Sequence, residues 1–361
     1  MRVLILWADG KSGNYGVRVL AEGMAALARQ AWGDDVVVNF QDYGRGDSSV
    51  SFGLRAIAED LRSRNGPIKT KVRQYDAVID SGAGDSFADI YGFKRLFTMV
   101  YGQRAVVRQG VPLLLGPQTI GPFNTRIGRT VARRTLKSAA VVLTRDSVSQ
   151  AYATELGRTP DLLTTDVVFA LPRPDKTQLH DVLLNVSGLL WFPNPHVDHD
   201  LYRKAVVGLV KDLRDRGREV ALLAHVINPV STVDDRAAIL ELTELVPGIQ
   251  VALPESLTAA RETIGGANLV IAARMHASLN ALSLGVPTIP WAYSRKFAPL
   301  LADIGWKYSV DLRTEPEVAE RTLATIEAME GDGIGSILSA VRQAADERLA
   351  QAATALREAV R

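Results

Sequence analysis

Residues 269–277 read LVIAARMHA, and this stretch decides the fold class. Its first five residues form a continuous apolar run, as in a strand buried on both faces, and a helical pattern follows over 277–284. The same alternation recurs along the chain, which predicts an α/β protein built on parallel sheets. The predicted strands are 3–7, 36–40, 77–80, 113–115, 140–144, 182–186, 220–225, 249–253, 269–272 and 288–291. The predicted helices are 17–30, 54–64, 201–216, 234–245, 257–264 and 277–284.

The number of elements indicates two domains. A chain of 361 residues exceeds the size at which one core usually stops growing. Two series of strands and helices of similar size predict two Rossmann-like domains facing a cleft. We expect an N-terminal domain at 1–172, a linker near 171–180 and a C-terminal domain at 181–332. Residues 333–361 form a long helix, which either packs back on the N-terminal domain or joins a coiled coil with a partner.

Composition narrows the class of protein. With 42 basic and 40 acidic residues, the net charge of +2 gives no global reason to expect nucleic acid or an acidic membrane as a partner, so any preference for anions must come from the local placement of basic residues. The absence of cysteine excludes disulfides, thiolate metal sites and a cysteine nucleophile. The apolar run 3–7 is too short for a signal peptide, so we expect a cytoplasmic protein, or one peripheral at the inner face of the membrane. The histidines form no convincing metal constellation, and we expect no metal and no cofactor.

Arg274 and His276 are the strongest candidates for chemistry. They follow an apolar strand, and ligands of open parallel sheets bind at the carboxyl ends of strands. A helix N-terminus favours anions, a guanidinium binds carboxylate or phosphate, and an imidazole transfers protons near neutral pH. This pattern suits an anionic substrate that undergoes proton transfer. The alternative is a structural ion pair for Arg274 and a core hydrogen bond for His276.

Two further cations follow strand ends. Lys296 comes just after strand 288–291, next to the strand that precedes Arg274, so it could reach the same anion; the alternative is a solvated loop lysine. Arg145 follows strand 140–144, and Asp146 beside it suits a helix cap. We expect Arg145 to point toward the cleft, with an interdomain salt bridge as the alternative.

Glycine-rich loops after strands could admit a sugar. Asn14 lies in one such loop, Gly82, Gly84 and Asp85 in a second, and Gln118 in the stiff turn after strand 113–115. A helix cap or a pure turn explains these residues equally well. Separately, 126–137 carries basic residues at helical spacing that could meet lipid phosphates, or form a solvated face. These basic residues are Arg126, Arg129, Arg133 and Lys137.

Five short motifs together resemble one family. They are GPQ at 116–118 with Gly-Pro at 121–122, TRDS at 144–147, RMHA at 274–277, GVP at 285–287, and Tyr293 followed by Lys296. In order and approximate spacing they are similar to the polysaccharide pyruvyl transferase family, over a region from Val3 to about Trp306. The RMHA block with the downstream motifs is the specific part.

The resemblance implies a fold similar to that of GT-B glycosyltransferases and an enzyme that uses phosphoenolpyruvate as donor. The acceptor would be a pair of sugar hydroxyls on a polysaccharide or glycolipid precursor, free or linked to a lipid or nucleotide, and the product a ketal. His276 would be the general acid, with Arg145, Arg274, Lys296 and the backbone at Met275 binding the donor.

One position departs from the family, and two other functions stay open. Family members often carry an Asp after the glycine of the first loop, where this chain has Val17. The alternative functions are a GT-B glycosyltransferase that uses a nucleotide sugar and a non-catalytic sugar-binding protein. A nucleotide sugar is less favoured, because residues 277–284 contain no carboxylate to hold ribose hydroxyls.

Overall fold

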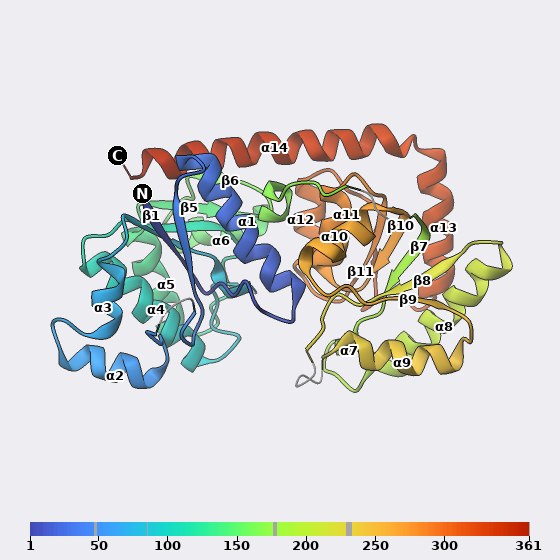
Figure 1. The fold of residues 1–361 in the computed structure, drawn as a ribbon, viewed down its shortest axis with the longest axis horizontal. Helices are drawn as coiled ribbons and strands as arrows, with labels where there is room; N and C mark the ends of the chain where they lie inside the picture. The colour runs from blue at the N-terminus through green and yellow to red at the C-terminus, as the bar shows by residue number, and fades with distance from the viewer. Residues whose placement is uncertain (47–48, 85, 176–178, 229–232, 361) are drawn as a thin grey trace. The chain divides into compact units, whose positions relative to one another are not determined.

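The computed structural model describes residues 1–46, 49–84, 86–175, 179–228 and 233–360 (Figure 1). The chain divides into two compact units. Unit 1 comprises Met1–Lys11, Leu20–Leu171 and Ala345–Arg361, and unit 2 comprises Ser12–Val19 and Pro172–Ala344. The loop at 12–19 was predicted to belong to the N-terminal domain, but the contacts of this loop group it with unit 2.

Unit 1 is built on a six-stranded parallel sheet in the order β2-β1-β3-β4-β5-β6. The strands are β1 (Arg2–Leu6), β2 (Val37–Gln41), β3 (Ala77–Asp80), β4 (Leu113–Gln118), β5 (Val141–Thr144) and β6 (Leu162–Leu163). The helices are α1 (Tyr15–Trp32), which belongs to unit 1 from Leu20 onward, α2 (Leu54–Arg62), α3 (Pro67–Val72), α4 (Phe93–Arg108), α5 (Arg126–Ser138) and α6 (Ser147–Glu155). The strand order reverses between β1 and β3.

Unit 2 has a second six-stranded parallel sheet, in the order β12-β11-β10-β7-β8-β9. Its strands are β7 (His180–Asn185), β8 (Val220–Leu223), β9 (Gln250–Ala252), β10 (Ala267–Ala272), β11 (Thr288–Ala292) and β12 (Val310–Asp311). Its helices are α7 (Gly188–Trp191), α8 (His199–Asp215), α9 (Asp235–Leu245), α10 (Leu257–Gly265), α11 (Met275–Ser283), α12 (Phe297–Asp303) and α13 (Val318–Gly331). The order reverses between β7 and β10, and the predicted α/β class with two Rossmann-like domains is confirmed.

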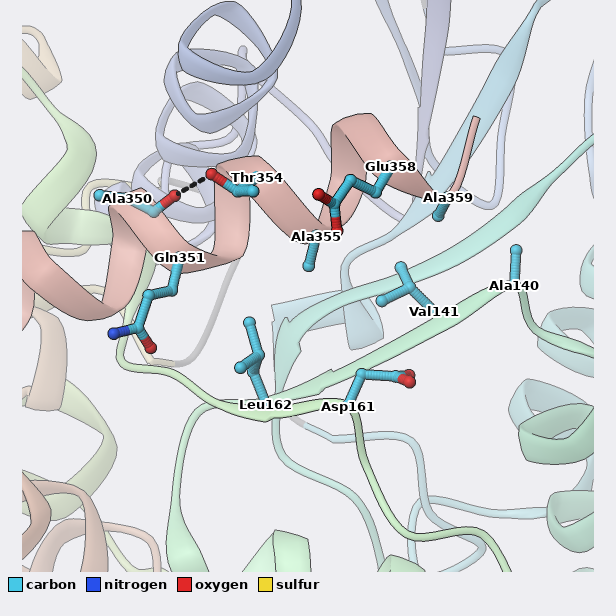
Figure 2. Close-up of a pocket in the computed structure, with 10 residues that line it drawn as sticks. All are labelled: Ala140, Val141, Asp161, Leu162, Ala350, Gln351, Thr354, Ala355, Glu358 and Ala359. Carbon is cyan, nitrogen blue, oxygen red and sulfur yellow. Dashed lines mark hydrogen bonds between the residues drawn. The ribbon is translucent and has the colours of Figure 1, made fainter. Parts of the chain in front are cut away.

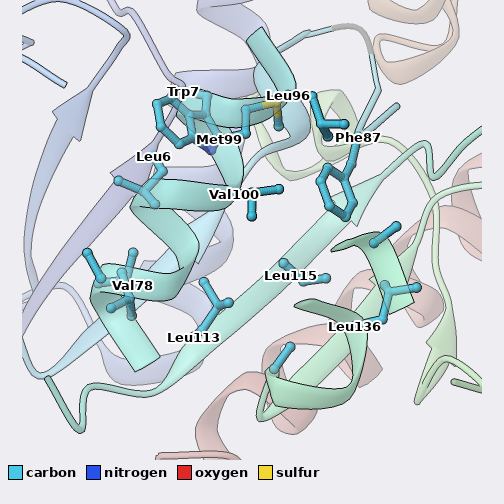
Figure 3. Close-up of a cluster of buried hydrophobic side chains, with 14 of the residues drawn as sticks. Leu6, Trp7, Val78, Phe87, Leu96, Met99, Val100, Leu113, Leu115 and Leu136 are labelled. Carbon is cyan, nitrogen blue, oxygen red and sulfur yellow. The ribbon is translucent and has the colours of Figure 1, made fainter. Parts of the chain in front are cut away.

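Buried strands account for the apolar runs in the sequence. All four residues of β3, β5 and β8 are buried, because helices cover both faces of a parallel sheet. In unit 1, side chains from β1, β3 and β4 pack against α4 and α5 in one cluster (Figure 3). Its members include Leu6, Val78, Leu115, Met99 and Leu136.

The prediction for residues 116–118 was wrong. Instead of a turn that presents Gln118, the chain continues β4 through Gly116 and Pro117. The pairing with β5 shifts between Leu115 and Gln118, where Gln118 resumes register with Thr144. An irregular register of this kind tolerates a proline inside a sheet. Gly116 and Pro117, which usually indicate a turn, therefore lie within a strand here.

Other elements also differ from the prediction. Helices α3, α4, α7, α12 and α13 were not predicted. In α4, buried polar residues such as Thr98 and Gln103 interrupt the apolar period. Strands β6 and β12 have two residues each, too few for a pattern. Helix α11 begins at Met275 rather than Ala277, which puts His276 in its first turn.

Helix α14 (Ile334–Glu358) completes the fold at the C-terminus. Its apolar residues at near-heptad spacing are buried within this chain, and its last part belongs to unit 1. There Arg357 Nε donates to the carbonyl of Ala31 at 2.7 Å. None of the helices in the described part of the chain is long and apolar enough to cross a membrane.

A hollow of about 670 Å³ separates the end of α14 from the starts of β5 and β6 (Figure 2). It lies at the amino ends of these strands, opposite the edge at which ligands of parallel sheets bind. The Asp161 carboxylate on its wall already accepts hydrogen bonds from Val142 N and Arg158 Nη2. This hollow is therefore a poor candidate for the active site.

Candidate functional site

The reversal of strand order in unit 2 lies between β7 and β10. In open α/β sheets the crevice at such a reversal, outside the carboxyl ends of the strands, binds ligands. Asn185, the last residue of β7, ties three strand ends together there. Its Nδ2 donates to Leu223 O at 2.9 Å, and its Oδ1 accepts from Arg274 N at 3.0 Å. Arg274 follows β10. Arg274 and His276, the strongest candidates from the sequence, therefore lie at this reversal of strand order, which we call the switch point of unit 2.

Arg274 is held by a buried carboxylate. Its Nη2 and Nε lie 2.7 and 3.1 Å from Asp235 Oδ1, and Nη2 also donates to Val233 O at 2.6 Å. Burial acts to lower the pKa of Arg274, but the charge and hydrogen bonds of Asp235 outweigh it and raise the pKa. Its Nη1 makes no hydrogen bond with the described residues, and Arg274 is 9% exposed. One edge of the guanidinium thus stays available to a ligand.

Asp235 is the centre of this network and was not singled out in the sequence. It opens α9, is fully buried and accepts from the backbone N–H groups of Gly188, His225 and Val226 at 2.9 to 3.0 Å. A carboxylate with several donors is well compensated despite its burial. In the sequence Asp235 follows Asp234, which caps α9. Two acidic residues at the start of a helix are typical of capping, so no sign of a second role for Asp235 was present in the sequence.

His276 packs against the first turn of another helix. A Cβ placed on Gly16 would lie 2.8 Å from His276 Nδ1. Gly16 is in the first turn of α1, where its N–H donates to Asn14 Oδ1 at 2.9 Å. Two helix N-termini therefore meet at this imidazole, and both favour a bound anion. Asn14, expected on the acceptor side, caps α1, so the missing acid at Val17 is not needed for this cap.

A second histidine lies beside the first. Asn280 Nδ2 donates to His276 O at 2.7 Å and lies 3.2 Å from His225 Nε2. Burial, with smaller effects from the charges of His276 and Arg274, lowers the pKa of His225 to about 3. His225 is therefore neutral, and the amide donor assigns the acceptor role to its Nε2. Sequence reasoning missed His225, because its neighbours come from distant elements.

Lys296 and Met275, the other predicted donor ligands of unit 2, each lie at the start of a helix. Lys296 is the N-cap residue of α12 and is partly buried. It follows β11, the strand that pairs with β10, so Lys296 and Arg274 follow neighbouring strand ends. Met275 is the first residue of α11. The Tyr293 ring packs 5.6 Å from Phe297, which fixes the turn that carries Lys296.

Arg145 lies in the core of unit 1. Its Nη1 is 2.9 Å from Asp166 Oδ2 and its Nε donates to Thr119 Oγ1 at 2.9 Å. The residue is 2% exposed. Its ion pair is internal to unit 1 and not the interdomain pair considered from the sequence. Asp146 caps α6, as predicted, by accepting from Ser149 N at 2.7 Å.

Two of the remaining acceptor candidates, Gly82 and Gln118, contact the buried Asp80 in unit 1. The Asp80 carboxylate accepts from Trp7 Nε1, Gln103 Nε2 and Gly82 N, each at 2.8 Å. Burial raises the pKa of Asp80, and these hydrogen bonds only partly offset it. Gln118 is buried and donates to Asp80 O at 3.1 Å.

The glycine loop beside Asp80 is tightly built. Gly82 has a φ of 72°, and a Cβ there would lie 2.6 Å from Gln118 Oε1, so the position requires glycine. Gly84 ends the short 3₁₀ turn Gly82–Gly84. Asp85 lies outside the described residues.

One grouping offers metal-ligand atoms within the described part of the chain. Asp198, His199 and Asp200 place such atoms within 4.8 Å of one another at the start of α8. Asp198 Oδ1 already caps that helix by accepting from Asp200 N and Leu201 N. The two carboxylates are exposed, and exposed acidic groups at a helix start need no metal to explain them.

Comparisons with solved structures show the fold. The UDP-GlcNAc 2-epimerase from Methanocaldococcus jannaschii matches with a TM-score of 0.59 at 12% identity, over 92% of this chain and 94% of that one. The Neisseria meningitidis UDP-GlcNAc 2-epimerase bound to UDP-GlcNAc gives 0.59 and 12%, over 98% and 99%. Anabaena HepE in complex with UDP gives 0.58 and 13%, over 99% of both chains. These likenesses show a GT-B-like fold with two Rossmann-like domains.

Sequence comparison identifies the family. No curated protein matches the chain. The family model for polysaccharide pyruvyl transferase matches residues 14–295, a span that contains the switch-point residues of unit 2 from Asn185 to Arg274 and His276. The chain therefore belongs to the polysaccharide pyruvyl transferase family.

Proposed function

We propose that this protein transfers a pyruvyl group from phosphoenolpyruvate to two hydroxyls of a saccharide, forming a cyclic ketal. One observation carries the proposal beyond family membership: Arg274 and His276 lie together at the switch point of unit 2. An anion-binding guanidinium is thus next to a histidine in the first turn of a helix. This is the combination that an anionic substrate with proton transfer requires.

The donor site in this proposal is made by unit 2. Phosphoenolpyruvate carries a carboxylate and a phosphate on a three-carbon frame, so several donors must converge on it. We assign Nη1 of Arg274, the ammonium of Lys296 and the backbone N–H groups around Met275 to these anions. Arg145, a donor ligand in the resemblance, is left out, because it is only 2% exposed in the core of unit 1, whereas Arg274 keeps its Nη1 for a ligand.

His276 acts as the general acid in this scheme. It protonates the methylene carbon of phosphoenolpyruvate, and the central carbon gains positive character. One sugar hydroxyl adds to that carbon and loses its proton. The second hydroxyl displaces inorganic phosphate, which takes the remaining proton, and the ketal closes. The sum is phosphoenolpyruvate plus a diol giving ketal plus phosphate, without oxidation or reduction.

The acceptor assignment rests on the loop that precedes α1. Asn14 is two residues from Gly16, which contacts His276, so a sugar beside Asn14 would be near the proton donor. We keep the Gly82–Gly84 turn as a second acceptor element. Gln118 packs against that turn, and its amide donates to Asp80 O instead of facing a ligand. The acceptor is a saccharide, free or carried by a lipid or a nucleotide.

Phosphate release tests the proposal. The protein is incubated with phosphoenolpyruvate and a panel of saccharide acceptors in D₂O, and the product is analysed by mass spectrometry. We expect phosphate release with one deuterium in the new methyl group, because the added proton comes from solvent through His276. His276→Asn should abolish release, while His199→Asn, on the surface of α8, should not. Transfer of a sugar from UDP-GlcNAc instead would assign the chain to glycosyl transfer.

A further inference from the structure

We propose that the outer faces of α4 and α5 form a docking surface for an anionic lipid membrane. We call this surface the α4–α5 face. It is defined by Phe93, Phe97, Arg104 and Arg108 on α4 and by Ile127 and Arg134 on α5. The proposal is independent of pyruvyl transfer, since none of these residues belongs to the donor site.

The first observation is a group of exposed apolar side chains. Phe93, Phe97 and Ile127 are 58%, 49% and 70% exposed. Helices α4 and α5 pack against each other and join successive parallel strands, so they run in the same direction (Figure 1). Their first turns therefore lie at the same end of the sheet and bring these side chains to one end of the face. Exposed apolar groups that gather in this way mark interaction sites.

The second observation is charge. Helix α4 carries four Lys or Arg residues and α5 carries five, and neither contains an acidic residue. Asp89 is the only acidic residue from 86 to 138, and its carboxylate is held by Asn124 N, Thr125 N and Thr125 Oγ1. No salt bridge to the described residues involves these nine cations. Because the whole chain has a net charge of only +2, the positive charge is concentrated on these two helices.

The third observation is a groove of about 230 Å³ between the two helices. Its apolar wall consists of Val100, Val107 and Val131, and three guanidinium side chains line it as well. These are Arg104, Arg108 and Arg134. Guanidinium groups around an apolar wall suit a phosphate that is attached to alkyl chains.

An anionic membrane explains all three observations together. Aromatic and aliphatic side chains enter the boundary between headgroups and acyl chains, while Arg and Lys bind lipid phosphates. Nucleic acid would use the cations but gives no reason to expose Phe93 and Ile127. A soluble acidic partner would not need the apolar end of the face. Membrane docking would hold unit 1 at a surface where lipid-carried saccharides reside.

Vesicle co-sedimentation tests the docking surface. The full chain is mixed with vesicles of phosphatidylcholine alone, or with phosphatidylglycerol added at one part to two. We expect binding only to the anionic vesicles, weakened by added salt. Arg104→Gln with Arg134→Gln should reduce the partition coefficient roughly fivefold per charge removed. Phe93→Ser with Ile127→Ser should also reduce it.

Matched controls come from unit 2. Lys204→Gln with Lys211→Gln removes the same charge from exposed positions of α8, and Leu201→Ser with Leu240→Ser removes exposed apolar groups. Both controls should bind as the wild type does. Failure to bind either vesicle would overturn the proposal, as would equal losses in the control variants. So would preferential binding of a soluble polyanion such as heparin, with the same dependence on the arginines. Circular dichroism of each variant checks that it is folded.

Discussion

The imidazole of His276 packs against Gly16, a residue without a side chain. A Cβ at this position would be too close to Nδ1. The glycine therefore provides the space that the imidazole occupies. The sequence predicted Arg274 and His276 as site residues because they follow an apolar strand directly. It could not predict Asp235 or His225, since their contacts join residues many positions apart and no local pattern records them.

Gly16→Ala should therefore impair catalysis more than folding. The new methyl group forces His276 or α1 to shift, and displacements near 1 Å at a reacting centre can cost about a hundredfold in rate. We expect a large fall in the rate of phosphate release with a melting temperature close to that of the wild type. Gly208→Ala is the control, because a Cβ at Gly208 meets only Ala319 Cβ at 4.0 Å. Equal rates for both variants would contradict the placement of His276.

The neutral state of His225 should make the protein sensitive to acid. Burial holds its pKa at about 3 in the folded protein, against 6.5 for an unperturbed histidine. Between these values the unfolded chain binds one more proton, so the free energy of unfolding decreases as the pH falls. The slope from this residue is at most about 1.4 kcal/mol per pH unit. Urea unfolding of the wild type and His225→Gln from pH 7 to pH 4 measures it. An unchanged slope in the variant would contradict this origin.

At the scale of elements, the switch point of unit 2 is held by polar groups rather than by apolar packing alone. Asp235 at the start of α9 connects the loops after β7 and β8 with Arg274 at the start of α11. The strands themselves were predictable, since buried parallel strands produce apolar runs. Strand β4 was mispredicted at its end, because Gly116 and Pro117 indicate a turn unless the shifted pairing with β5 is known.

Asp235→Asn should destabilise the protein strongly. It leaves the Arg274 guanidinium buried without its counter-charge, and breaking a buried pair in this way costs about 3–5 kcal/mol. Urea unfolding measures the loss, with the exposed helix cap Asp198→Asn as a control expected to lose about 1 kcal/mol or less. Adding Arg274→Met to Asp235→Asn should recover part of the stability. A loss for Asp235→Asn no larger than that of the control would refute the role of Asp235.

At the scale of the whole molecule, the two units and the grouping of the C-terminal helix with the first of them were predictable, because length and the repeated series of strands and helices indicate two domains. The end of α14 belongs to unit 1, which is one of the two alternatives considered for this helix. The short segment Ser12–Val19 belongs to unit 2, although the residues on both sides of it belong to unit 1. This exchange depends on long-range packing, which cannot be inferred from composition or periodicity. The buried face of α14, however, was visible in its near-heptad spacing.

The end of α14 should stabilise unit 1. Leu356 is fully buried, and truncating a buried leucine to alanine typically costs about 2–5 kcal/mol. Leu356→Ala should therefore lower the urea midpoint, while Leu201→Ala, at a position 60% exposed, should leave it nearly unchanged. If the two variants unfold at the same urea concentration, the end of α14 does not contribute to the fold.

Calorimetric titration of phosphoenolpyruvate tests the central claim most directly. The wild type, Lys296→Gln and Arg295→Gln are each titrated with phosphoenolpyruvate and, separately, with UDP-GlcNAc. Loss of a hydrogen bond to a charged group should weaken phosphoenolpyruvate binding to Lys296→Gln about tenfold or more, whereas the adjacent, exposed Arg295 should not matter. We expect phosphoenolpyruvate to bind the wild type, whether or not UDP-GlcNAc also binds as a saccharide carried by a nucleotide. Binding of UDP-GlcNAc without binding of phosphoenolpyruvate would contradict the proposed function.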